Sequence, residues 1–390
     1  MTNYEKMQEL LINNGMNQKV ARGFVRKFKI DEVSFPCSDE EKKWAMMRGF
    51  FPGRIKLYGL TEDNYQCFLP DYVDFQLHPY NNHFVVWIND KLSLRYTLGG
   101  DFNDIIPKYY LYIENNGDYT YLNDAPKSIP KNKDFILNLL GEKKILIMKP
   151  NSSKSGGAGV MKVEYIDGRI CINNKTCVSN IEFEEIINGL RNYIVTEYAR
   201  QHQELMQIWP DSACTLRIIM VKLPHQEFFS ETQWRCIISF ARFGTSVSGG
   251  TSNLSAGGVG VGFDFETGIF KPFGMRYMQF CPDGQTKGYE HPNTHVVWKD
   301  YRLPNWNYVK NTIFKICNHY GSLSHLGFDV IITDSGFVLC EINSKPAINY
   351  NQVICGPVLS SDEIRSYFNS KGMDKIDCKE LYEIYKQSQE

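Results

Sequence analysis

The segment from Leu326 to Pro346 constrains the fold more than any other part of the sequence. It holds two apolar runs separated by Asp334-Ser335-Gly336, a combination typical of two antiparallel strands joined by a tight turn. We expect Asp329 to begin the first strand, and Glu341 and Asn343 to end the second. Because a short antiparallel turn brings those two ends side by side, the sequence predicts a sheet with oxygen-bearing side chains gathered at one place.

These three side chains have the chemistry of a magnesium site. Glu341 and Asn343 are two residues apart in a strand, so they point to the same face. Two carboxylates and an amide oxygen are hard ligands, which suit Mg²⁺ bridged to phosphates. Charges at the solvent-exposed end of a hairpin are the alternative, and the pairing geometry favours the metal site.

A second segment, Lys144 to Val163, carries a lysine followed by a glycine-rich loop. A short apolar strand ends at Lys149, glycines follow at 156, 157 and 159, and a second strand is expected from Val160 to Glu164. Backbone N–H groups of such a loop form an anion-binding concavity. The lysine precedes the loop, so this is not a P-loop. We interpret the segment as a phosphate cradle, with an ordinary glycine-rich hairpin as the alternative.

A further lysine stands at the predicted start of a helix. Residues 84–89 are expected to form a strand that leads into a helix capped by Asp90, and this helix ends near Gly99-Gly100. A cation such as Lys91 in the first helical turn is unfavourable for the helix dipole. It is better explained if lysine and helix terminus bind one anion, although a solvated lysine is common.

Residues 191–205 are predicted to form a strand that becomes a linker. An adenine ring needs an apolar slot with a few backbone hydrogen bonds, and a carboxylate further along can accept hydrogen bonds from ribose hydroxyls. The apolar end of this strand and Glu204 match those needs.

Two arginines interrupt apolar strands in the second half of the chain. Arg217 and Arg242 lie in runs that we expect to be neighbouring antiparallel strands. Buried cations need an anionic partner. Structural salt bridges and binding of a substrate anion are equally consistent with the sequence.

Composition excludes several classes of protein. The 390 residues favour two or three domains, and the net charge of −1 gives no field for nucleic acid or anionic membranes. Apolar runs are too short to span a membrane, and the polar N-terminus lacks a signal-peptide core.

The eleven cysteines contain no Cys-x-x-Cys, so we expect buried free thiols and a cytoplasmic location.

The order of these motifs resembles the ATP-grasp superfamily, and most of all its sugar-transfer-associated branch. The resemblance covers roughly residues 50–360 and implies an α+β fold in which two lobes grip ATP, with a small, mostly helical N-terminal module. The implied division is an N-terminal module at 1–85, a small lobe with the glycine-rich lid at 86–195, and a large lobe with the metal site and a C-terminal helix at 196–390.

The resemblance assigns roles residue by residue. In similar ligases the two lysines contact phosphates, the hinge residues hold adenine, and the glutamate seven residues beyond the hinge glutamate binds ribose. The nucleotide-binding set is then Lys91, Lys149, Ser155, Gly156, Gly157, Glu197, Tyr198, Ala199 and Glu204. The resemblance also implies that Asp329, Glu341 and Asn343 ligate two magnesium ions.

One departure from the pattern affects the choice of catalytic residues. D-alanine–D-alanine ligases carry an arginine two residues before the metal-binding aspartate, where this chain has Gly327. Stabilisation of the transition state then has to come from Arg217, with Arg242 as the second candidate. The substrate of those ligases is therefore not carried over.

The implied activity is that of an ATP-dependent carboxylate–amine ligase. An acyl phosphate forms first, and an amine then displaces phosphate to give an amide. The branch suggests a sugar acid or an amino acid in surface polysaccharide synthesis, so the partners are small-molecule carboxylates and amines rather than nucleic acid. The alternatives are a phosphotransferase acting on a hydroxyl and a nucleotide-binding module without turnover. The sequence gives no indication of the oligomeric state.

Overall fold

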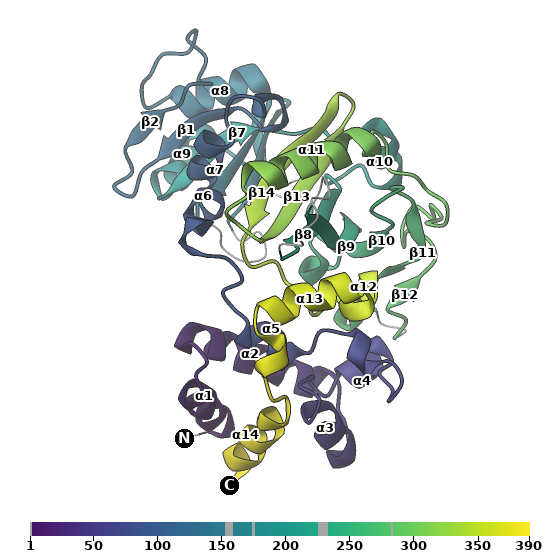
Figure 1. Cartoon of the computed structure of the whole chain (residues 1–390). Helices are drawn as coiled ribbons and strands as arrows, with labels where there is room; N and C mark the ends of the chain where they lie inside the picture. The colour runs from purple at the N-terminus through teal and green to yellow at the C-terminus, as the bar shows by residue number, and fades with distance from the viewer. Residues whose placement is uncertain (1, 153–158, 174–175, 225–232, 282–283) are drawn as a thin grey trace.

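A computed structural model describes residues 2–152, 159–173, 176–224, 233–281 and 284–390. Two β-sheets, each with helices packed on it, lie next to each other in the upper part of Figure 1. A cluster of helices lies below them and contains both ends of the chain. Within the described residues, no helix is both long and apolar enough to cross a membrane.

The N-terminal part of the chain is helical, as predicted. Its helices are α1 (Asn3–Asn13), α2 (Gln18–Ser34), α3 (Asp39–Met46), α4 (Arg54–Tyr58) and α5 (Asp71–Gln76). Capping boxes begin α1 and α3, with Thr2 and Ser38 as the N-caps. The C-terminal helix α14 (Lys379–Gln389) returns to this cluster and packs against α1. Leu381 and Ile384 of α14 therefore share a core with Phe24 of α2.

The first sheet has seven antiparallel strands. In spatial order they are β2 (Tyr119–Tyr121), β1 (Tyr109–Ile113), β7 (Tyr193–Glu197), β3 (Ile145–Pro150), β4 (Met161–Ile166), β5 (Arg169–Ile172) and β6 (Thr176–Val178). Helices α8 (Phe135–Lys143) and α9 (Asn180–Asn188) supply buried side chains to a core with one face of this sheet. The opposite face of this sheet packs toward the second sheet. Tyr109 and Ile194, from β1 and β7, belong to the same hydrophobic core as residues of the second sheet.

The second sheet is also seven-stranded and antiparallel. In spatial order its strands are β12 (Lys287–Gly288), β11 (Phe270–Met275), β10 (Val259–Phe263), β9 (Trp234–Phe243), β8 (Thr215–Lys222), β13 (His325–Thr333) and β14 (Gly336–Asn343). Helix α11 (Trp306–His319) packs on one face. The other face packs against α12 (Gln352–Cys355), α13 (Asp362–Ser370) and part of the N-terminal cluster. The observed α+β architecture agrees with the expectation.

The segment between the N-terminal cluster and the first sheet differs from the prediction. Residues 84–89 do not form a strand: a 3₁₀ turn (His83–Val85) runs into α6 (Val86–Asn89), and α7 (Lys91–Thr97) follows. Of the four residues of α6, only Ile88 is buried. A short apolar run can be a strand or a helical turn, and here the contacts of α6 with β14 decide the outcome. The predicted cap is confirmed, since Asp90 accepts a hydrogen bond from the backbone N–H of Ser93 at 2.8 Å.

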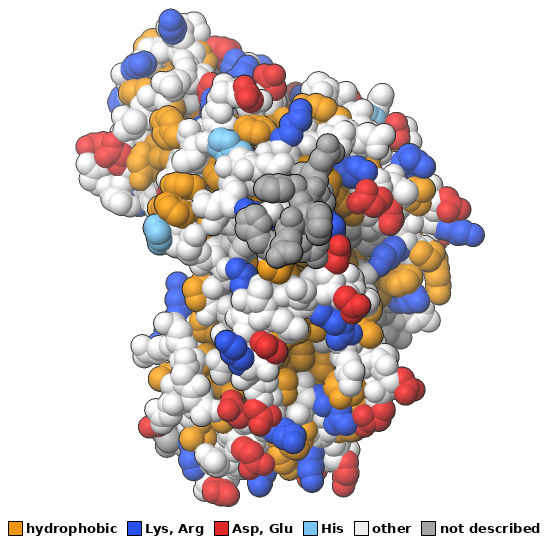
Figure 2. Space-filling model, viewed as in Figure 1, with side chains coloured by type: hydrophobic (Ala, Val, Ile, Leu, Met, Phe, Trp, Pro, Cys, Tyr) orange, Lys and Arg blue, Asp and Glu red, His pale blue; other side chains and the backbone are white. Residues whose placement is uncertain are grey.

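The described surface carries both signs of charge. On the face in Figure 2, acidic and basic side chains are interspersed over the helical cluster and the sheets, with no broad region of a single sign. This distribution on the face shown agrees with the net charge of −1.

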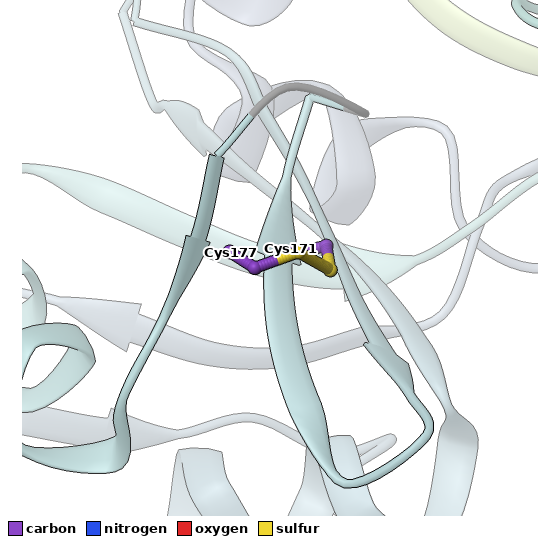
Figure 3. Close-up of a disulfide and its surroundings, with 2 residues drawn as sticks. All are labelled: Cys171 and Cys177. Atoms are coloured by element: carbon purple, nitrogen blue, oxygen red, sulfur yellow. A yellow bond between two sulfur atoms is a disulfide. The ribbon is translucent and has the colours of Figure 1, made fainter.

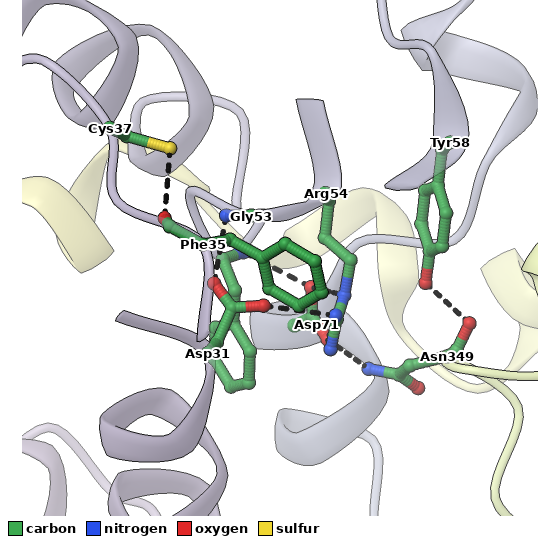
Figure 4. Close-up of polar contacts among 9 residues, drawn as sticks. Asp31, Phe35, Cys37, Gly53, Arg54, Tyr58, Asp71 and Asn349 are labelled. Carbon is green, nitrogen blue, oxygen red and sulfur yellow. Dashed lines mark hydrogen bonds and ion pairs between the residues drawn. The ribbon is translucent and has the colours of Figure 1, made fainter. Parts of the chain in front are cut away.

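A buried ionic network joins the N-terminal cluster to the end of the second sheet (Figure 4). Arg54 forms ion pairs of 3.0 Å with both Asp31 and Asp71. Asp71 also accepts a hydrogen bond from the side chain of Asn349 at 2.7 Å, and the backbone carbonyl of Asn349 accepts one from the hydroxyl of Tyr58. The segment that follows β14 is therefore fixed by helices at the other end of the sequence.

Removing the cation of this network should unfold the protein at much lower denaturant concentration. Arg54→Met leaves Asp31 and Asp71 buried without a counter-charge, and loss of one partner of a buried pair costs about 3–5 kcal/mol. Urea denaturation followed by circular dichroism measures this change. The matched control is Lys386→Met, which removes an ion pair with two half-exposed partners and should cost less than about 1 kcal/mol. Equal losses in the two variants would contradict the prediction.

Candidate active site

The hairpin of β13 and β14 brings the three predicted metal ligands together. Asp329 and Glu341 are direct partners across the hairpin, and the amide nitrogen of Asn343 donates a hydrogen bond to Glu341 Oε1 at 3.1 Å. The predicted turn is confirmed, because Thr333 pairs with Gly336. Asp329 does not begin its strand as expected. It lies in the middle of β13, because the pairing with β8 extends the strand back to His325.

Both predicted arginines bind Asp329. Arg217 is its direct partner in β8, with Nε 2.7 Å from Oδ1 and Nη2 2.9 Å from Oδ2. Arg242, from β9, places Nη2 3.0 Å from Oδ1, and its Nε donates to the hydroxyl of Thr215 at 2.9 Å. Asp329 is only 5% exposed, so two guanidinium groups compensate one buried carboxylate. Both arginines therefore form a salt bridge with Asp329. They lie next to the group formed by Asp329, Glu341 and Asn343, which we call the acidic cluster.

Lys91 contacts the same cluster from the other side. Its Nζ lies 3.5 Å from Glu341 Oε2, and the residue is 7% exposed. Burial by itself raises the pKa of Glu341, but its hydrogen bond with Asp329, the charge of Lys91 and the charge of Arg217 lower it to about 2. Glu341 is therefore ionised at neutral pH and available as a ligand.

Lys149 reaches the cluster from the first sheet. In β3, Leu146 and Met148 point into the core beneath α8, so the alternation of a strand turns Lys149 to the opposite face, toward the second sheet. Burial, together with the nearby charge of Lys91, lowers the pKa of Lys149 to about 8, although Cys340 and Glu341 oppose the shift. Its Nζ lies 5.8 Å from the centre of the Tyr109 ring. Both lysines and all three candidate ligands are thus brought to one place between the sheets.

The two lysine segments are also bonded to each other, which the sequence did not reveal. The backbone N–H of Lys91 donates to the carbonyl of Asn151 at 3.1 Å, and Asp90 forms a β-bridge with Ser152. Asn151 stands two residues after Lys149 and was not among the predicted nucleotide-binding residues. Its partners are about sixty residues away in the chain, and no local pattern marks such a pair.

The glycine-rich loop lies mostly outside the described residues. This applies to Ser155, Gly156 and Gly157. Gly159 is described and has φ of 85°; a Cβ at this position would lie 2.5 Å from the Tyr193 hydroxyl. Glycine is therefore required where the loop enters β4. This strand begins at Met161, one residue after the predicted start at Val160.

The predicted hinge follows β7. Glu197 ends the strand and is exposed, and Tyr198 and Ala199 are half-buried. Glu204 lies in the first turn of α10 (Gln203–Ile208) and is exposed. The Nζ of Lys162 lies 5.3 Å from the centre of the Tyr198 ring, which connects the hinge to the hollow beside it.

This hollow has a volume of about 390 Å³. It lies between the first sheet and the segment that joins α10 to β8. Its lining residues are Lys162, Glu164, Ile166, Cys171, Cys177, Pro210 and Asp211. It is bounded by strands β4, β5 and β6 at one edge of the first sheet, and Lys162, which lines it, lies next to the Tyr198 ring of the hinge.

The expectation that the cysteines are free thiols is wrong for two of them. Cys171 and Cys177 form a disulfide (Figure 3), and they are direct partners in the neighbouring strands β5 and β6. This pairing brings the two residues together although they are six apart in the chain. The other nine cysteines are free, as expected, but only Cys214, Cys281 and Cys317 are fully buried, and the other six are partly exposed.

The structure explains the glycine that stands two residues before Asp329. A Cβ on Gly327 would lie 2.4 Å from Cβ of Pro346 and 2.8 Å from its Cγ. Pro346 belongs to the segment that follows β14, which Asn349 anchors to the N-terminal cluster. An arginine cannot occupy this position without displacing that segment. Among the residues that the structure describes, the cations of the site are Lys91, Lys149, Arg217 and Arg242.

We expect Gly327→Ala to destabilise the fold by about 1–3 kcal/mol, the usual cost of overpacking. The matched control is Gly141→Ala, at an exposed position of α8 with no atom within 4 Å of the added Cβ. Replacing a helical glycine by alanine should stabilise by about 0.5–1 kcal/mol. Thermal unfolding of both variants checks the opposite signs, and an unchanged melting temperature for Gly327→Ala would refute the steric argument.

The residues of the cluster fit a divalent cation. A carboxylate offers about four lone-pair positions, and Asp329 uses three of them for arginine N–H groups. Glu341 and the amide oxygen of Asn343 add further hard donors beside it. Within the described residues, no cluster of three or more His, Cys, Asp or Glu side chains forms a metal site of another kind.

Comparison with known proteins identifies the family. A model of the family described as sugar-transfer associated ATP-grasp matches residues 72–365. A search of curated proteins returned no match.

Three solved structures illustrate the range of similar chains. The ATP-grasp ligase PsnB, complexed with a precursor variant, Mg and ADP, is 11% identical, with a TM-score of 0.38, over 74% of this chain and 62% of its own. The ADP complex of purK, an N5-carboxyaminoimidazole ribonucleotide synthetase, is 8% identical, with a TM-score of 0.40, over 75% and 54%. D-alanine–D-alanine ligase from Bacillus anthracis complexed with ATP is 14% identical, with a TM-score of 0.37, over 78% and 70%.

The first two of these matches cover less than two thirds of the matched proteins, and all three TM-scores are below 0.5. The match to the family model spans well over half of the sequence and includes both sheets. The chain belongs to the sugar-transfer-associated ATP-grasp family.

Proposed function

We propose that this protein is an ATP-dependent carboxylate–amine ligase that uses Mg²⁺. The proposal rests on one observation. Lys91 and Lys149 both lie near Glu341, in the same cluster as Asp329 and its two arginines. In the described part of the site, four cations around two carboxylates leave an excess of positive charge, which suits a polyphosphate together with an anionic acceptor.

In this proposal the triphosphate lies between the two sheets. Lys91, Lys149 and the loop residues Ser155, Gly156 and Gly157 bind its phosphates. Glu197, Tyr198 and Ala199 hold the adenine, and Glu204 binds the ribose. The hollow next to Lys162, whose ammonium group lies near the Tyr198 ring, supports this placement of the base.

Asp329, Glu341 and Asn343 would hold the magnesium ions. When bound, Mg²⁺ neutralises charge on the transferred phosphoryl group. Arg217 and Arg242 are proposed as the catalytic cations. They stabilise the charge that develops on the phosphoryl oxygens, and their contacts with Asp329 hold both guanidinium groups in place before reaction.

The acceptor carboxylate attacks the γ-phosphorus of ATP, which gives an acyl phosphate and releases ADP. An amine then displaces phosphate from the carbonyl carbon and forms the amide. Holding the reactants together can contribute about 7–11 kcal/mol of the barrier, so positioning and electrostatics are sufficient without a covalent enzyme nucleophile.

The chemistry of the cluster favours a carboxylate over a hydroxyl acceptor. A hydroxyl needs a base, but among the described residues of the cluster the pKa of Glu341 is about 2, and Lys149, with a pKa of about 8, is protonated at neutral pH. Burial raises the pKa of Asp329 against the charges of Arg217 and Arg242, but both of its oxygens are engaged by these arginines. A carboxylate is already ionised at neutral pH and needs no base. Phosphoryl transfer to a hydroxyl or sugar acceptor is therefore the second candidate.

The family description supports a substrate from glycan metabolism. We propose a sugar acid or an amino acid used in surface polysaccharide synthesis as the carboxylate or amine partner. The proposal includes a cytoplasmic location, where ATP is available, and the division of the chain into a module at 1–85 and lobes at 86–195 and 196–390.

Release of ADP tests the proposal. Wild-type protein with MgATP is incubated with panels of uronic acids, amino acids and amino sugars, singly and in pairs, and ADP is measured. We expect release to depend on both a carboxylate and an amine, and to disappear in Glu341→Gln but not in the exposed control Glu266→Gln. ADP release with a hydroxyl acceptor and no amine would replace the ligase by a phosphotransferase. Unchanged activity in Glu341→Gln would remove the proposed site.

A further inference from the structure

Asn151 makes a hydrogen bond with each of its polar groups. The residue is 5% exposed. Its backbone N–H donates to the carbonyl of Asn192 at 2.9 Å, and its carbonyl accepts from the N–H of Lys91 at 3.1 Å. Its side-chain oxygen accepts from the N–H of Leu92 at 3.0 Å, and its side-chain nitrogen donates to Asp90 Oδ2 at 2.5 Å.

These bonds connect three segments that carry proposed nucleotide-binding residues. Asn151 follows β3, which delivers Lys149, and precedes the glycine-rich loop. Leu92 and Asp90 flank Lys91 at the start of α7. Asn192 precedes β7, the strand that ends at the hinge.

Each carboxylate oxygen of Asp90 accepts a hydrogen bond in this arrangement. Its Oδ1 caps α7 through the N–H of Ser93, while its Oδ2 is bound by Asn151. The orientation of the Asn151 amide is fixed, because only the oxygen can accept from the N–H of Leu92. The donor must therefore face Asp90.

We infer that Asn151, with Asp90 as its partner, is a positioning residue that sets the separation of Lys91 and Lys149 at the phosphate site. The inference rests on the proposed nucleotide site. Neither Asn151 nor Asp90 needs to touch the nucleotide. The pair acts through Lys91 and Lys149, whose ammonium groups bind the same triphosphate in the proposed site. A displacement of about 1 Å at such a site can cost about 10²-fold in rate.

The hydrogen bond can be broken and then restored by exchanging its two ends. Asn151→Asp keeps the acceptor for Leu92 but places a carboxylate against Asp90. Asp90→Asn places an amide donor against the amide donor of Asn151. The double variant D90N/N151D restores one donor and one acceptor, keeps a good N-cap at position 90, and leaves the charge beside Lys91 unchanged.

A buried asparagine elsewhere provides the matched control. Asn81 is 6% exposed, and its side chain donates to the carbonyl of His325 at 2.6 Å and accepts from two backbone N–H groups at 2.9 and 3.0 Å. Asn81→Asp should therefore destabilise the fold in a similar way, but it does not contact either lysine segment.

The experiment measures the Kd for MgADP by calorimetry, the KM for ATP and the melting temperature in all five proteins, including wild type. We expect N151D and D90N each to weaken MgADP binding and raise the KM for ATP by about 10–100-fold, and D90N/N151D to return both to within about threefold of wild type. N81D should lower the melting temperature and leave both nucleotide constants unchanged.

Two results would overturn the inference. One is nucleotide binding by N151D within about threefold of wild type at a melting temperature lowered as in N81D, which would make the residue merely structural. The other is a double variant as impaired as the single variants. Failure of wild-type protein to bind MgADP is a distinguishable result, because it removes the proposed function itself.

Discussion

Lys149→Met is expected to reduce ATP-dependent turnover by about 10²–10³-fold while making the protein more stable at neutral pH. Lys149 is 8% exposed, and burial lowers the pKa of its ammonium group to about 8. At pH 7 the folded protein therefore carries a charge that it holds at a cost. Methionine has a similar length and no charge, so it removes that cost along with the proposed phosphate contact.

The sign of the pH dependence follows from the same shift. The pKa of a lysine in the unfolded chain is near 10.4, and it is about 8 in the folded protein. Between these values the unfolded state binds more protons, so stability rises with pH from about 8 to about 10.5. The full difference corresponds to about 3 kcal/mol. Denaturant titrations at pH 7, 8.5 and 10 should show this rise in wild type and a flatter profile in Lys149→Met.

Activity of Lys149→Met should fall by about 10²–10³-fold, the usual loss for one preorganised electrostatic contact. Lys144→Met is the control, because Lys144 is an exposed lysine that precedes the same strand. A variant at position 149 that is less stable than wild type at pH 7, or that keeps full turnover, would contradict the assignment.

Asp329→Asn should damage both stability and activity. The substitution conserves volume but leaves Arg217 and Arg242 without their anion, and an uncompensated buried charge costs about 3–5 kcal/mol. It also removes a proposed metal ligand, so we expect ADP release to fall by about 10²–10³-fold in the folded fraction. Urea denaturation and ADP release, both at 15 °C, separate the two effects.

The control for Asp329→Asn is Asp264→Asn. Asp264 is exposed and lies just after β10 in the same sheet, so its replacement should change stability by no more than about 0.5 kcal/mol. If Asp329→Asn were as stable as this control, the two arginines would not depend on Asp329. Our electrostatic description of the cluster would then be wrong.

The parts of the site that the sequence predicted are local in the chain. The hairpin containing Asp329 and Glu341 closes through a turn of two residues, so strand pattern and turn chemistry bring the two strands together. The register shifts between Val330 and Asp329, and this irregularity, which the sequence did not reveal, pairs Asp329 with Glu341 instead of Cys340. Lys149 could be placed at a strand end for the same reason. Short periodic segments bounded by turn residues specify such neighbours directly.

The errors and omissions depend on contacts between distant segments. Residues 84–89 were expected to form a strand, but residues 86–89 form the helical turn α6, which packs against β14 and buries Ile88. Asp329 lies in mid-strand because β8, more than a hundred residues earlier, extends the pairing. The bond of Asn151 to Asp90 spans 61 residues. Spacing alone cannot specify such partners, since they are chosen by the packing of whole elements.

The contact between α1 and α14 has a consequence for the kinetics of folding. Asn3 and Gln389 are hydrogen-bonded across 386 positions of the chain, and the apolar core around Phe24 includes Leu381 and Ile384 of α14. Closing so long a loop is entropically expensive and is repaid only by contacts made late. We therefore expect the terminal helices to acquire protection from amide hydrogen exchange after both sheets have formed.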